Sequence, residues 1–356
     1  MTDHASAPAR PKSHPRRWVA IVVVIAACLL VAEVTARAVE PLLPPADQWP
    51  TDQTSAKADQ IAGLAAGGSP IDVVFLGSSV VVQGVDPIAF NDAPSDLTSY
   101  NAALDGASPR SVEAWAKDVV FPSLDPQAVV IGITTRDLND RGVSQQEFYR
   151  SLLASSGLQD LEPQSGGNRL FNDIADLSAL LRIRPFLRQP GTTLQHVLGQ
   201  DSEVGLLPGP FGAAPIDENS FAYDSSESWR NFWRTRHFND FTMGGHELSA
   251  LQSLIDLAIE QQRRVFLVEM PLHNDYLSVQ PNGEVEVERL HNLLANLEYD
   301  TGVELIALGD RYGPEVFRDP AHLNPDGAAA LGAELAAYVA DSIQVLNTKT
   351  QARIEP

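Results

Sequence analysis

The feature that most limits the fold is a set of four short apolar runs, most of them closed by glycine or proline. They lie at 71–77 (IDVVFLG), 128–134 (AVVIGIT), 264–271 (RVFLVEMP) and 303–309 (VELIALG). Each is shorter than an ordinary core helix and lacks alternation of polar and apolar positions. This pattern is typical of strands buried on both faces of a parallel sheet.

Helical patterns separate or follow these runs, at 111–121, 248–262, 287–299 and 325–346. The last begins with Asn324 at the N-cap and Pro325 at the first helical position, which are favoured residues there. Strands that alternate with helices predict an α/β fold with a parallel sheet. Residues 155–245 interrupt the alternation and are rich in Gly, Pro and aromatic residues, so we expect an insertion that forms a substrate lid.

Charge and cysteine content exclude several classes of function. The net charge is -21 at pH 7, and the basic residues of the N-terminal tail make the remainder more acidic still. An acidic surface repels phosphates, so we expect no nucleic-acid partner. Cys28 is the single cysteine, which excludes an intramolecular disulfide and a multi-cysteine metal site. No His, Asp and Glu spacing suits a metal, and we expect no cofactor.

The N-terminus predicts export. Residues 18–32 (WVAIVVVIAACLLVA) are uncharged and apolar, and an extension to 39 reaches the length of a membrane span. Arg and Lys residues precede the segment, which places the N-terminus in the cytoplasm. A cleavable signal peptide is the alternative, because Ala36-Arg37-Ala38 has the form of a cleavage site. Either alternative puts the remaining chain outside the cytoplasmic membrane, anchored or secreted.

The expected organisation has five parts. They are a cytoplasmic basic tail (1–17), a transmembrane anchor or signal peptide (18–39), a linker (40–70), an α/β domain (71–345) that contains the 155–245 insertion, and a C-terminal tail (346–356).

Four short blocks carry the chemistry. They are Gly77-Ser78-Ser79, residues 100–106 (YNAALDG), residues 132–137 (GITTRD) and residues 319–325 (DPAHLNP). Their order and placing resemble the signature blocks of SGNH/GDSL hydrolases, over about residues 71–340 with the middle third unmatched. The resemblance implies a flavodoxin-like α/β/α sandwich, Ser79 as nucleophile, and Asp319 and His322 as the rest of a catalytic triad.

The residue types suit this chemistry. A serine hydroxyl needs a base to remove its proton during attack, and His322 is the candidate. Asp319, three residues earlier, can hold the imidazole in the required tautomer and stabilise its protonated form. The tetrahedral intermediate also needs hydrogen-bond donors, for which we expect the backbone N–H groups of Ser79 and Gly106.

The third block departs from the family pattern. Arg136 stands where the family has an asparagine that donates to the oxyanion. Arginine is longer and permanently charged, so Arg136 is a candidate for the oxyanion, for an anionic part of the substrate, or for a pair with Asp137. Asn139 is a poorly aligned substitute.

His273 follows the third strand and is a candidate substrate contact, with a solvated loop histidine as the alternative.

Three functions remain open. The first is an esterase or deacetylase that forms an acyl-enzyme on Ser79. The second is an O-acyltransferase that passes the acyl group to a hydroxyl of a cell-envelope polysaccharide. The third is a binding or scaffold domain with weak catalysis, which Arg136 keeps open. The expected partners are an acylated carbohydrate or another ester, and the cytoplasmic membrane through residues 18–39.

Overall fold

The computed structural model describes residues 15–40, 52–142, 178–183, 208–216, 219–308 and 311–354. The chain divides into two compact units, residues 1–47 with 164–202, and residues 48–163 with 203–356. Most of the expected basic tail, part of the expected linker and much of the 155–245 insertion lie outside the described residues.

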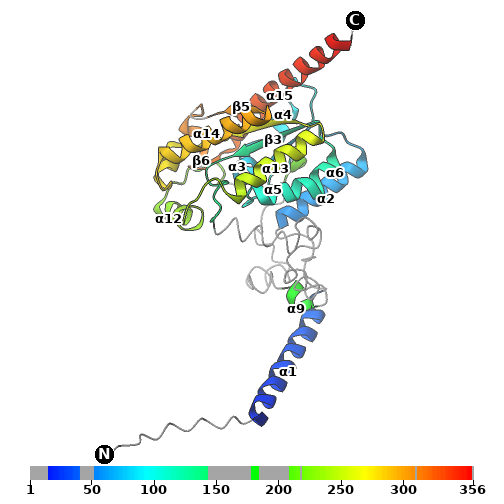
Figure 1. Cartoon of the computed structure of the whole chain (residues 1–356), viewed down its shortest axis with the longest axis vertical. Coiled ribbons are helices and arrows are strands. Elements are labelled where there is room, and N and C mark those ends of the chain that lie inside the picture. Colours follow the sequence, from blue (N-terminus) through cyan, green and yellow to red (C-terminus); the bar gives the residue numbers. More distant parts are fainter. Residues whose placement is uncertain are drawn as a thin grey trace, which may run out of the picture. The chain divides into compact units, whose positions relative to one another are not determined.

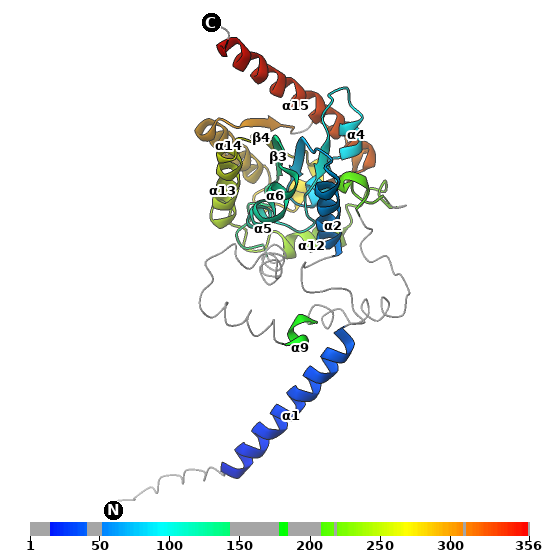
Figure 2. The ribbon, with the colours of Figure 1, turned by 90° about the vertical axis from the view of Figure 1, so that its right-hand side faces the viewer.

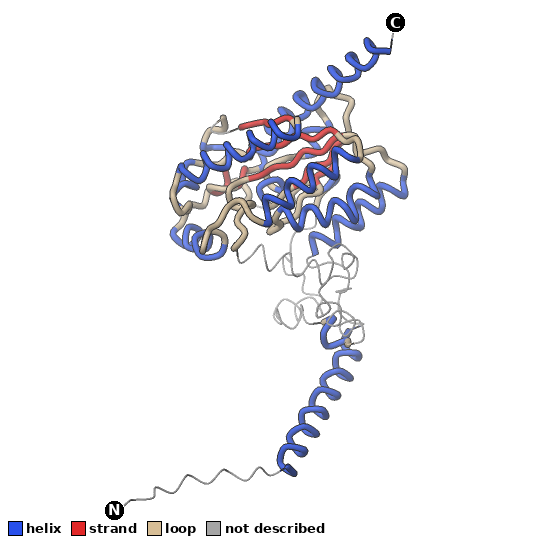
Figure 3. Tube along the Cα trace, in the orientation of Figure 1, coloured by secondary structure: helices blue, strands red, loops and turns tan. Residues whose placement is uncertain are grey.

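The second unit is built on a parallel sheet of five strands in the order β2-β1-β3-β4-β5. The strands are β1 (Val73–Leu76), β2 (Ser99–Asn101), β3 (Ala128–Ile133), β4 (Arg264–Glu269) and β5 (Glu304–Ala307). Helices cover both faces, with α5 and α13 on one side and α4 and α15 on the other (Figures 1 and 3). This strand order is that of flavodoxin, so the expected α/β fold is confirmed. The short β2 has no apolar run in the sequence and is an additional strand.

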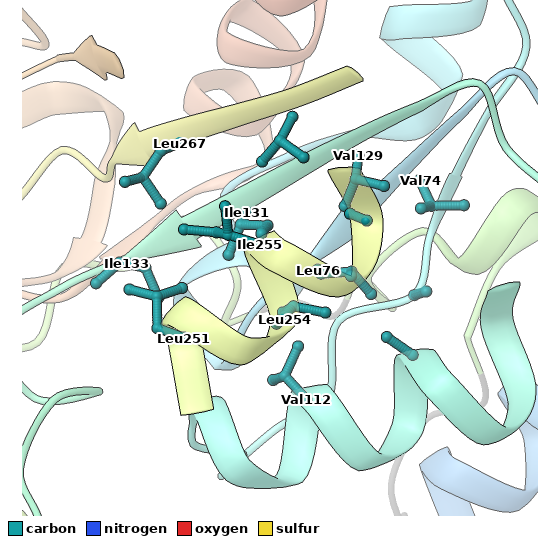
Figure 4. Packing of buried hydrophobic residues seen from close by; sticks show 14 of the residues in the cluster. Val74, Leu76, Val112, Val129, Ile131, Ile133, Leu251, Leu254, Ile255 and Leu267 are labelled. Atoms are coloured by element: carbon teal, nitrogen blue, oxygen red, sulfur yellow. The ribbon is translucent and has the colours of Figure 1, made fainter. Parts of the chain in front are cut away.

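One face of the sheet is covered by α2 (Asp52–Gly67), α5 (Pro109–Trp115), α13 (His246–Glu260) and α14 (Glu284–Thr301). Alternate strand residues point to this face, because successive side chains in a strand point in opposite directions. Ile131 of β3 packs with Leu254 and Ile255 of α13 in this cluster (Figure 4). A π-helical turn (Ala116–Val120) and α6 (Phe121–Leu124) continue α5.

The opposite face is covered by α3 (Ser79–Val82), α4 (Pro87–Asn91) and α15 (Pro325–Ile354). Figure 2 shows the same unit from the side, with α4 beside α15. Asp86 caps α4 by accepting a 2.8 Å hydrogen bond from the N–H of Ile88. The helices α13, α14 and α15 agree with the helical patterns of the sequence, because each buries an apolar face against the sheet.

Residues 52–67, which the sequence places in a linker, form α2 of the second unit. Thr54, Lys57 and Ile61 of this helix are fully buried. The stretch is rich in alanine and has good helix propensity, and its buried face joins the core on α6 and the π-helical turn.

The first unit contains α1 (Pro15–Val39), of which Val19–Val39 is apolar and long enough to cross a membrane. The Ala36-Arg37-Ala38 tripeptide is helical within α1. The carboxylate of Glu33 accepts hydrogen bonds from Ser178 Oγ (2.8 Å) and the N–H of Ala179 (3.0 Å) at the start of α9 (Ala179–Arg182). The charge that interrupts the apolar segment is therefore hydrogen-bonded within the chain.

The turn after β1 depends on glycine. Gly77 has φ +152°, and a Cβ at this position would lie 2.8 Å from the carbonyl oxygen of Gly132 and would clash with Val81. Only glycine lets the backbone pass this close to β3 before Ser79.

Gly77→Ala should lower the free energy of unfolding by about 2–4 kcal/mol, because it adds a steric overlap to an unfavourable φ. Gly63→Ala in α2 is the matched control, since a Cβ there meets nothing within 4 Å, and alanine should stabilise the helix slightly. Thermal melting of the two variants measures the difference. Equal melting temperatures would contradict the strict need for glycine at 77.

Candidate active site

Ser79 and two residues near the end of the chain, Asp319 and His322, form a continuous hydrogen-bonded chain. Ser79 Oγ lies 2.9 Å from His322 Nε2. His322 Nδ1 lies 2.8 Å from Asp319 Oδ2. Ser79 begins α3 after the turn that follows β1, at the carboxyl edge of the sheet, where open α/β folds place their ligands. The arrangement can deliver the serine proton to an imidazole that a carboxylate orients.

The loop that carries Asp319 and His322 is held by its own hydrogen bonds. β6 (Phe317–Asp319) pairs antiparallel with β7 (His322–Leu323), with Asp319 opposite His322. Asp319 Oδ1 accepts from the N–H groups of Ala321 (2.8 Å) and His322 (3.1 Å). Asn324 caps α15 through Gly327 N–H at 3.0 Å, and the 3₁₀ turn η6 (Pro314–Val316) precedes β6. The close spacing of the two residues therefore suits one tight turn.

The expected oxyanion donors lie on adjoining segments. Ser79 is the first residue of α3, so its N–H precedes the helical hydrogen-bond pattern. The N–H of Leu104 donates to the carbonyl oxygen of Gly77 at 3.1 Å, which joins the 101–106 loop to the turn before Ser79. Gly106 has φ +79°, in the left-handed region. This conformation turns the backbone sharply two residues after Leu104.

Arg136 is buried and bonded to protein groups. Its side chain is 1% exposed. The guanidinium donates to the carbonyl oxygen of Ala107 (3.2 Å), to Asp137 Oδ1 (3.0 Å) and to His237 Nδ1 (3.3 Å). Of the three roles expected for Arg136, the pair with Asp137 is present. The side chain also ties the 101–107 segment to the end of β3.

Asp137 and Asn139 have structural partners as well. Asp137 Oδ2 accepts from Thr134 through the backbone N–H (2.8 Å) and the hydroxyl (2.9 Å). Asn139 Nδ2 donates to the carbonyl oxygen of His237 at 2.6 Å, and its Oδ1 accepts from the N–H of Thr242 at 3.0 Å. These bonds fix the 237–242 segment to the end of β3.

His237 is a residue of the site region that the sequence analysis missed. It follows α12 (Glu227–Arg236). The centroid of its ring lies 4.6 Å from that of Trp233, and the centroid of the Trp233 ring lies 5.9 Å from that of His322. Burial, with smaller contributions from Arg136 and His322, lowers the pKa of His237 to about 2. It is therefore neutral at physiological pH, and Nδ1 can accept from Arg136. The aromatic residues that precede His237 are the only sequence signal that could have pointed to it.

His273 lies beside the triad loop. Its N–H donates to the carbonyl oxygen of Pro320 at 3.0 Å, and its Nδ1 lies 2.8 Å from the hydroxyl of Tyr223. The same hydroxyl donates to Asp275 Oδ2 at 2.7 Å, in the 3₁₀ turn η5 (Asn274–Ser278). His273 therefore joins Tyr223, from the described part of the insertion, to the loop of Asp319 and His322.

The part of the chain that the structure describes contains no group of three His, Cys, Asp or Glu side chains that could hold a metal ion.

His237 should make the protein less stable in acid. Below pH 6.5, its ordinary pKa, the unfolded chain binds a proton that the folded chain does not bind until about pH 2. Stability is then lost as the pH falls, by roughly 2–3 kcal/mol between pH 6.5 and 4. His237→Asn should therefore lose less stability than the wild type over this interval, as measured by melting temperature. The exposed His246→Asn is the control, and an unchanged slope in His237→Asn would contradict the assignment.

No family model matches the sequence, and no curated protein matches it. Among solved structures, the chain is similar to a GDSL-like lipase from Bacteroides thetaiotaomicron, at 11% identity and a TM-score of 0.40, over 81% of this chain and 98% of that one. It is also similar to an acetylxylan esterase from Geobacillus stearothermophilus, at 11% identity and a TM-score of 0.37, over 76% of this chain and 94% of that one.

Proposed function

We propose that the chain is a member of the SGNH/GDSL superfamily and a serine-dependent ester hydrolase that acts outside the cytoplasmic membrane. The observation that carries the proposal is the hydrogen-bonded chain from Ser79 through His322 to Asp319, with links of 2.9 and 2.8 Å. The order of the four sequence blocks and the flavodoxin-like strand order support it.

The reaction follows from the geometry. His322 Nε2 removes the proton of Ser79 as Oγ attacks the ester carbonyl, and Asp319 stabilises the imidazolium. The N–H groups of Ser79 and Gly106 stabilise the negative oxygen of the tetrahedral intermediate. When that intermediate collapses, the ester C–O bond breaks, and His322 gives its proton to the alcohol. Water then attacks the acyl-enzyme with His322 as base and releases the carboxylic acid.

The proposed substrate is an acylated carbohydrate or another ester. Aromatic side chains with exposed faces support a carbohydrate: Phe221, Tyr223 and Phe232 are each 40% exposed or more. Tyr223 is bonded to His273, whose backbone contacts the triad loop. Sugar rings present apolar C–H faces that pack on aromatic rings, while their hydroxyl groups bond to nearby polar side chains.

An O-acyltransferase is the second candidate. It uses the same acyl-enzyme, with a polysaccharide hydroxyl in place of water. The observation that favours it is the low solvent exposure of the base. His322 is 9% exposed, and it lies beside an apolar cluster that contains Trp233, Phe238, Tyr276 and Ala321. Limited water access prolongs the life of an acyl-enzyme and favours a bound acceptor.

Ser79→Ala should abolish hydrolysis of p-nitrophenyl acetate and labelling by a serine-directed phosphonate, and Asp319→Asn should lower kcat about 10³- to 10⁴-fold. Ser78→Ala is the matched control, because Ser78 Oγ is buried without a hydrogen-bond partner among the described residues. If Ser79→Ala behaves like the wild type, or if the wild type shows neither turnover nor labelling, the enzyme proposal fails and a binding domain remains. Added sugar acceptors then distinguish the two enzymes, since a transferase yields acylated sugar in preference to free acid.

The chain should remain in the membrane through α1, with its N-terminus in the cytoplasm. The length and apolarity of Val19–Val39 and the basic residues before it support this orientation. Carbonate extraction should leave the protein in the pellet, and its intact mass should include residues 1–39. A soluble product that begins after Ala38 would show signal cleavage instead.

A further inference from the structure

Helix α2 contacts the loop that carries Gly106. The side chain of Lys57 is fully buried, and its Nζ donates to the carbonyl oxygens of Asn101 (2.8 Å) and Ala103 (2.7 Å). One turn earlier, Gln53 accepts from the N–H of Asp105 at 2.9 Å and donates to its carboxylate at 3.2 Å. Lys57 and Gln53 of α2 therefore hold every second residue of the loop, namely Asn101, Ala103 and Asp105, the last of which precedes Gly106.

The same loop contacts the segment of Ser79. Asn101 Nδ2 donates to the carbonyl oxygens of Val81 (3.0 Å) and Val85 (2.9 Å), in and just after the short helix that Ser79 begins. Asn101 Oδ1 accepts from the N–H of Ala103 at 3.2 Å. A shift of the backbone at 101–103 would thus move Gly106 relative to Ser79. Lys57 holds the backbone at the two ends of this stretch.

The buried position of Lys57 costs free energy, because its amine is removed from water. Burial lowers the pKa of Lys57 to about 7, against a smaller opposite contribution from Asp105. Taking a charged amine out of water costs free energy, and its hydrogen bonds to carbonyl oxygens offset that cost only in part. What Lys57 provides, and an apolar side chain cannot, is a pair of donors that fix two carbonyl groups.

We propose that Lys57 is a positioning residue, which holds the 101–106 loop so that the N–H of Gly106 can face the oxyanion beside Ser79. The inference rests on the proposed function, because that function gives Gly106 its role. It also makes α2 a support of the active site, although the sequence places these residues in a linker.

Lys57→Met in the full chain tests the proposal, with Ile61→Ala as the matched control. Ile61 is one turn further along α2 and is also fully buried, and its substitution leaves a cavity that lowers the melting temperature. We expect Lys57→Met to keep or raise the melting temperature, to lower kcat for p-nitrophenyl acetate about ten- to a hundredfold, and to change KM less than threefold. Ile61→Ala should keep kcat within twofold of the wild type.

Two further measurements separate positioning from packing. Methylammonium or ethylammonium should restore part of the kcat of Lys57→Ala, because a small cation can occupy the space of the missing ammonium. Hydrogen exchange should accelerate at the amides of 102–107 in Lys57→Met but not in Ile61→Ala. A kcat loss in Lys57→Met no larger than in Ile61→Ala, with unchanged exchange, would overturn the inference.

The outcomes keep the two proposals apart. If the wild type is active and labelled but Lys57→Met is fully active, only the inference on Lys57 fails. If the wild type shows neither activity nor labelling, the proposed function fails and the catalytic role of Lys57 fails with it. Hydrogen exchange then still reports whether Lys57 holds the loop.

Discussion

The contact on which the candidate site depends is the 2.9 Å hydrogen bond between Ser79 Oγ and His322 Nε2. It joins the end of the first strand to a turn near the end of the chain, and a serine without this base is a weak nucleophile. The parallel sheet makes the contact possible, because it brings the carboxyl ends of its strands to one edge. The β6–β7 turn holds Asp319 and His322 together, and the start of α15 contacts this turn.

Around this contact, buried polar side chains hold the loops in place. Arg136 ties Ala107, Asp137 and His237 together, and Lys57 ties α2 to Asn101 and Ala103. Buried polar networks are stabilising only when their members find partners, and they then specify one arrangement of the backbone. In this protein such networks lie at the ends of β2 and β3, where the geometry around Ser79 is set.

Much of the fold follows from local patterns. The apolar runs at 71–77, 128–134, 264–271 and 303–309 correspond to β1, β3, β4 and β5. β1 and β3 are buried at every position, as strands with both faces covered are, whereas β5 lies at the edge of the sheet and is only partly buried. β2 was not predicted, because its three residues are too few to show an apolar pattern. The helix α2 was not predicted, because its alanine- and glycine-rich segment has a weak apolar face. Its burial depends on contacts with α6 and the π-helical turn.

By itself, the sequence determined the α/β alternation, an apolar N-terminal segment and the identities of Ser79, Asp319 and His322 as candidates. These depend on residue type and short spacing, which the sequence displays directly. Only the tertiary structure decided that Arg136 turns to Asp137 and His237, that Trp233 lies between His237 and His322, and that Lys57 binds the loop of Gly106. Apart from the pair of neighbours Arg136 and Asp137, these contacts join residues far apart in the chain, and their partners depend on how helices and strands pack.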